Sequence, residues 1–124
     1  MKKNLLIIGL FAASALLPAH ALSQEEVKRC NAMAASFAAK KAEIVEAKAV
    51  LDKKAEMVET LGEQWEEAET HKLASPAHAK AAADAKAEWE GLKGEVLKAQ
   101  FALQSKVQML NSDVTAFNAS CAQD

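Results

Sequence analysis

Two heptad stripes of large apolar residues run through this sequence and mirror each other about Ala77. The stripe before this point is Cys30, Phe37, Ile44, Leu51, Val58 and Trp65, and the stripe after it is Trp89, Val96, Leu103, Leu110 and Phe117. A seven-residue repeat places apolar side chains along one side of a helix. Matching layers have residue numbers that add to 154, as two antiparallel helices joined by a short turn require. The sequence therefore predicts an all-α fold, a coiled-coil-like hairpin of two long helices.

The first 21 residues have the pattern of a secretory signal peptide. Lys2 and Lys3 precede an apolar run over residues 5–17, which is too short to span a bilayer as a stable helix. The small residues of Ala19-His20-Ala21 suit signal peptidase. We expect cleavage after Ala21 and export of residues 22–124 to a bacterial periplasm as one domain. An uncleaved membrane anchor is the alternative.

Helix-capping residues indicate where the two helices begin. Ser23 and Glu26 have the spacing of a capping box, and Ser75 precedes Pro76, a residue suited to the first helical position. The predicted elements are a helix over 23–73, a turn over 74–76 and a helix over 76–120.

Charge and composition exclude several classes of partner. Without Lys2 and Lys3, 13 basic residues remain against 17 acidic ones, a net charge of −4. Nucleic-acid binding requires a basic face, so we expect no nucleic-acid partner. We also expect no stable membrane insertion of the mature chain. A two-helix hairpin buries little apolar surface per residue, so it needs a covalent link or a partner.

Cys30 and Cys121 are the only cysteines, and their numbers add to 151, half a heptad step from 154, which places both at the open end of the hairpin. In an oxidising periplasm they predict a structural disulfide that joins the two chain ends. A redox centre would require a reactive pair such as Cys-x-x-Cys, which the sequence lacks. Pairing between two chains is the main alternative.

Bulky and small residues coincide near the turn. The register brings Trp65 and Trp89 together as core residues, and a ligand gripped between the indoles is the less favoured interpretation. Gly62 and Gly91 lie at that level, where we expect both to make room for an indole. A hinge built on these glycines and Gly94 is the alternative.

His71 and His78 flank the turn and are weak candidates for a metal site, because imidazole is a common ligand. Their spacing matches no standard motif, and helix-end chemistry explains both residues equally well. We find no pattern typical of a catalytic or cofactor-binding site, and we predict that the protein is not an enzyme.

Several large apolar residues fall outside the stripes at similar heights: Val50, Met57, Leu97, Phe101 and Met109. An isolated hairpin has nothing to cover them, which favours a contact surface for a protein partner or a second copy. The function we expect is protein–protein interaction as a structural or adaptor module. A small periplasmic holdase chaperone is the alternative, and an inhibitor, immunity-type or metal-binding protein is a second one.

Overall fold

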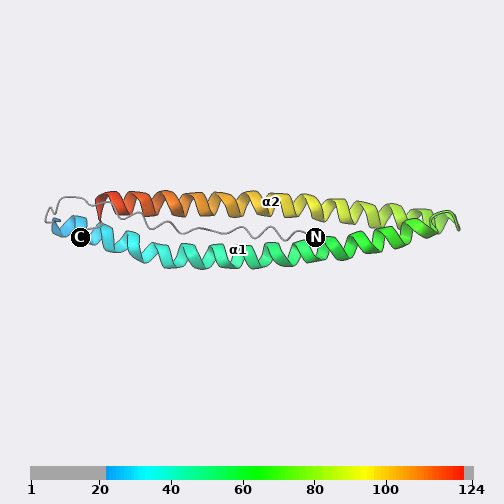
Figure 1. Ribbon diagram of the computed structural model, residues 1–124, viewed down its shortest axis with the longest axis horizontal. Helices are drawn as coiled ribbons and strands as arrows, with labels where there is room; N and C mark the ends of the chain where they lie inside the picture. The colour runs from blue at the N-terminus through cyan, green and yellow to red at the C-terminus, as the bar shows by residue number, and fades with distance from the viewer. Residues whose placement is uncertain (1–21, 122–124) are drawn as a thin grey trace.

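The computed structural model describes residues 22–121, which form two helices packed antiparallel along their whole length (Figure 1). Helix α1 spans Gln24–His71 and helix α2 spans Pro76–Ser120. The predicted all-α, two-helix hairpin is thereby confirmed. Helix α1 ends two residues before the expected position, and residues 72–75 make the turn. The expected signal peptide lies outside the described residues.

Local hydrogen bonds define both helix starts. The Ser23 backbone N–H donates to Glu26 Oε2 at 2.7 Å, and the Glu26 N–H donates to Ser23 Oγ at 3.2 Å, which completes the capping box. The backbone hydrogen bond from Ser23 is the main reason why the pKa of Glu26 is lowered. At α2, Ser75 Oγ accepts the N–H of His78 at 3.3 Å, and Pro76 occupies the first turn.

The aromatic layers show that the helices pair in the predicted register. The ring centroids of Trp65 and Trp89 lie 4.8 Å apart, with an angle of 23° between the stacked planes. Phe37 and Phe117 meet edge to face at 5.5 Å. These two pairs lie near opposite ends of the hairpin, so the register holds over most of its length.

The core between the helices is thin. Among residues 22–121 only Cys30, Ile44, Ala82 and Leu110 are buried, and none of these is less than 2% exposed. The other layers of the seam are half-buried. Since α1 has 48 residues and a rise of about 1.5 Å per residue, about 72 Å of helix depends on this narrow contact.

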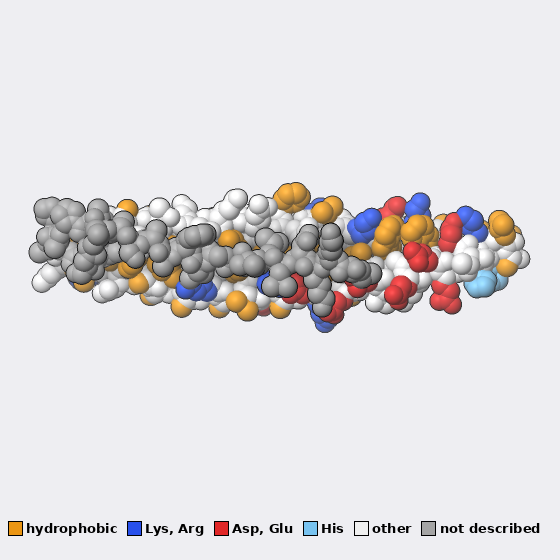
Figure 2. All heavy atoms as spheres, viewed as in Figure 1, with side chains coloured by type: hydrophobic (Ala, Val, Ile, Leu, Met, Phe, Trp, Pro, Cys, Tyr) orange, Lys and Arg blue, Asp and Glu red, His pale blue; other side chains and the backbone are white. Residues whose placement is uncertain are grey.

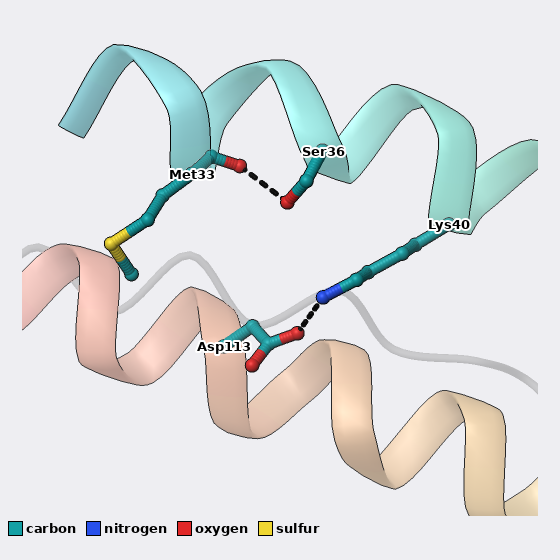
Figure 3. Close-up of polar contacts among 4 residues, drawn as sticks. All are labelled: Met33, Ser36, Lys40 and Asp113. Atoms are coloured by element: carbon teal, nitrogen blue, oxygen red, sulfur yellow. Dashed lines mark hydrogen bonds and ion pairs between the residues drawn. The ribbon is translucent and has the colours of Figure 1, made fainter. Parts of the chain in front are cut away.

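Two lysines lie in the seam itself, in a second half-buried row of α1. This row is Met33, Lys40, Ala47, Lys54, Leu61 and Ala68. Lys40 crosses to the carboxylate of Asp113 on α2 (Figure 3), and Lys54 crosses to Glu95 at 2.6 Å. The lysine stems cover apolar surface while acids of the partner helix neutralise the ammonium groups.

The disulfide predicted from the sequence is present at the open end. Cys30 and Cys121 are bonded with their Cα atoms 5.6 Å apart, across a sequence separation of 91 residues. On the chain-entropy model, closing such a loop destabilises the unfolded chain by roughly 4.5 kcal/mol. That is a large contribution for a hairpin with so small a core.

The glycines near the Trp pair differ in their surroundings. A Cβ added at Gly62 would lie 3.2 Å from Trp89 Nε1, whereas one added at Gly91 or Gly94 would meet nothing within 4 Å. Gly62 therefore makes room for an indole as expected. The same expectation for Gly91 is wrong, because its Cα faces open space. Both helices run unbroken through all three glycines.

This difference predicts opposite outcomes for two similar substitutions. Gly91→Ala should stabilise the hairpin by up to about 1 kcal/mol, because alanine has the higher helix propensity and the site is open. Gly62→Ala should gain less or lose stability, since its methyl group would press on the Trp89 ring. Chemical denaturation measures both, with Gly94→Ala as a second open-site control. Equal gains at positions 62 and 91 would contradict the packing.

A second prediction concerns the disulfide. Purified oxidised protein should contain no titratable thiol and should run as a single chain on non-reducing gels. Reduction should lower the melting temperature while far-UV circular dichroism at low temperature still shows high helicity, because the helices keep their caps and seam. A covalent dimer, or a melting temperature unchanged by reduction, would refute this role for the bond.

Candidate interaction surface

All five residues predicted to contact a partner are exposed. Phe101 is 69% exposed and Met109 61%, and Val50, Met57 and Leu97 are each about half exposed. Exposure is the condition that a contact surface must meet, but the five residues do not form one continuous patch.

Val50 lines a shallow groove on one side of the hairpin, and Met57 and Met109 lie on the same side. The groove is lined by Glu43, Glu46, Ala47, Val50, Ala99, Ala102, Leu103 and Lys106. Met57 follows Val50 by seven residues and Met109 follows Ala102 by seven, so each methionine continues a row that lines the groove. We call this the groove side.

Leu97 and Phe101 lie elsewhere, on the outer surface of α2. Phe101 is two residues from the half-buried Leu103, which places it on the opposite side of the helix. Leu97 is one helical turn away from Phe101 and shares its surface. Similar heights along the axis therefore do not bring these two residues into the groove.

Three other large apolar residues are exposed that the sequence analysis did not select: Val27, Val45 and Leu73. Val45 directly follows the buried Ile44 and is 69% exposed, in a stretch of α1 that is rich in alanine. The sequence could have indicated this exposure, because position 45 lies outside the heptad stripe. Leu73 lies in the turn and shares no row with the groove.

Ion pairs between the helices lie beside the groove. Lys106 Nζ is 3.0 Å from Glu43 Oε2, and Lys54 Nζ is 2.6 Å from Glu95 Oε2 further toward the turn. The hydrogen bond from Lys54 is the main reason why the pKa of Glu95 is lowered. These pairs neutralise charges that would otherwise disfavour contact with an apolar partner.

The stacked indoles near the turn leave little ring surface for a ligand. The Lys93 ammonium lies 4.0 Å from the Trp89 ring centroid, and that of Lys86 lies 5.7 Å from the Trp65 ring. Figure 2 shows hydrophobic side chains flanked by lysines and acids next to the histidine-bearing end of the molecule. This arrangement supports the interpretation that the Trp pair is a packing contact between the helices and not a ligand site.

The buried Nε1 of Trp65 makes no hydrogen bond within residues 22–121. This indole does help to lower the pKa of Glu69, but the Lys72 ammonium contributes most.

The tip histidines have local roles. His78 Nδ1 lies 2.7 Å from Ser75 Oγ, at the start of α2, and His71 is the last residue of α1. The part of the chain that the structure describes holds no group of three or more His, Cys, Asp or Glu placed to share a metal ion. Nor does either helix, over residues 22–121, combine the length and hydrophobicity needed to cross a bilayer.

Comparisons with protein-family models, curated proteins and solved structures find no match to this chain.

The Lys54–Glu95 pair predicts a pH dependence of stability. The pKa of Glu95 is lower in the folded state than its ordinary value of 4.5. The pair therefore stabilises the folded state above pH 4.5, and this stabilisation is lost as the pH falls through the folded-state pKa. Glu95→Gln should therefore unfold with a shallower pH dependence below about pH 4.5 than the native chain. Glu88→Gln, seven residues earlier in the same helical row, is the matched control. An identical pH dependence for native and Glu95→Gln chains would show that the pair does not contribute.

Proposed function

We propose that this chain is an exported helical-hairpin protein that acts by binding other protein, as a structural or adaptor module. The observation that supports this most is the exposure of large apolar side chains on the groove side, where Val50 and Met109 are 50% and 61% exposed. A groove that is lined mainly by apolar side chains and flanked by charged residues is typical of an interaction site.

The chemistry of the groove supports binding over catalysis. Its lining combines alanine, valine and leucine with Glu43, Glu46 and Lys106. Glu43 and Lys106 pair with each other across the helices. An open, mainly apolar groove suits the side chains of another helix, which would enter as ridges between the rows of α1 and α2.

The test is site-specific photo-crosslinking in a bacterial host that exports the chain. A photoreactive amino acid at Val50 or Met109 should give discrete adducts with protein, and one at the exposed, charged position Glu63 should not. The adducts from Met109 should disappear when Val50 is changed to Glu, because the charge would have to be buried in the contact. Absence of adducts at both groove-side positions would refute the proposal.

A holdase chaperone is the second candidate, and the two exposed methionines on the groove side favour it. Met57 and Met109 have long, flexible, polarizable side chains, which suit surfaces that bind many different apolar segments. The purified chain would then suppress aggregation of an unfolded client, and Met57→Glu with Met109→Glu would reduce that suppression. A chain that forms discrete adducts but protects no client is an adaptor and not a holdase.

A further inference from the structure

Charge is distributed very unevenly along the hairpin. Of the 47 residues nearest the turn, 52–98, 18 are Asp, Glu, Lys or Arg, and they carry a net charge of −4. The base half, 31–51 and 99–120, has only seven such residues among 43, with a net charge of +1. In Figure 2, red and blue side chains crowd the half of the molecule nearest the histidines.

The few charges of the base half are mostly neutralised within the hairpin. Lys40 pairs with Asp113 and Lys106 with Glu43, both across the helices, and Lys48 pairs with Asp52 along α1. Glu46 also lines the groove and makes no ion pair within residues 22–121, and the other lining residues are alanine, valine and leucine. Along α2, the row that follows Glu95 is Ala102, Met109 and Ala116.

A surface that is apolar and nearly neutral does not attract a strongly charged partner, but it is complementary to itself. A two-fold axis pairs the same patch on both copies, so a nearly neutral patch meets a nearly neutral patch, with Glu46 as the unpaired charge of its lining. The charged halves then determine whether the two copies pack parallel or antiparallel. Parallel packing would place two tips of net charge −4 side by side, whereas antiparallel packing puts them at opposite ends of the assembly.

We propose that the partner of the groove side is a second copy of this chain, packed antiparallel so that the two base halves form a four-helix bundle and the tips point in opposite directions. This inference rests on the proposed function, because it names the protein that the groove binds. Val50 and Met109 are the central contacts, and the outer surface of α2 with Phe101 stays outside the interface.

The size of the surface indicates a reversible association. The 21 residues 31–51 of α1 are about 30 Å long, and two helices are about 20 Å wide, which gives a face of about 600 Å² per copy. Stable interfaces bury about 800 Å² per partner, so this one lies below that size. The proportion of dimer should therefore rise with protein concentration.

Sedimentation velocity of the disulfide-intact chain, from low micromolar to millimolar concentration, tests the partner. The native chain should shift from monomer to dimer, and Val50→Glu or Met109→Glu should weaken the association at least tenfold. Phe101→Glu is the matched control, since it adds the same charge outside the interface and should change the dissociation constant less than threefold. Circular dichroism should show all three variants folded, because the three side chains are half or more exposed.

Labels at Ala77 in the turn test the direction. In the antiparallel dimer the helical rise over the shared base half and the two tip halves adds to a distance of about 100 Å between the two tips. Energy transfer between labelled copies should therefore be absent. Efficient transfer would overturn the antiparallel arrangement. Raising the salt concentration should leave the dissociation constant nearly unchanged, because the tips lie much further apart than a Debye length of about 10 Å.

The outcomes separate this inference from the function on which it rests. A chain that stays monomeric at every concentration, yet forms adducts with a different protein from Val50 and Met109, would overturn the second copy as partner and leave the binding function standing. A monomer that forms no adducts would refute both. If Phe101→Glu alone abolished the dimer, the interface would lie on the outer surface of α2, and the proposed interface on the groove side would be wrong.

Discussion

The narrow contact between α1 and α2 is the constraint on which the rest of the structure depends. Four buried residues and a series of half-buried layers hold together helices of 48 and 45 residues. Such a seam cannot offset the conformational entropy of the chain as a globular core does. The Cys30–Cys121 bond compensates at one end by restricting the unfolded chain, and the Trp65–Trp89 stack adds packing at the other.

The same thin seam leaves side chains in water that a larger fold would bury. The surroundings of these side chains differ along the length of the hairpin. Near the turn, charged residues surround the aromatic pair and keep that half well solvated. In the base half, cross-helix pairs such as Lys106–Glu43 neutralise most of the charge and leave an apolar groove between the helices. This division gives the molecule one half suited to contact and one suited to solvent.

The sequence predicted the layers of the seam because a heptad repeat specifies height along a helix, and the mirrored numbering brought Trp65 to Trp89 and Cys30 to Cys121. The residues outside the stripes, however, were compared by their height along the axis alone and not by their angle around the helix. For that reason Lys40 and Lys54 entered the seam without foreseen partners, and Phe101 was grouped with Val50 although the two lie on different surfaces. The open environment of Gly91 was missed for the same reason.

Hydrogen exchange of the oxidised and the reduced chain tests most directly whether the disulfide and the seam act together. If the bond holds the open end of a weak seam, reduction should remove amide protection first over residues 31–44 and 107–118. Protection around Trp65 and Trp89 should persist longer, because the stacked rings and the short turn still join the helices there. Equal protection of the open end before and after reduction would contradict this account.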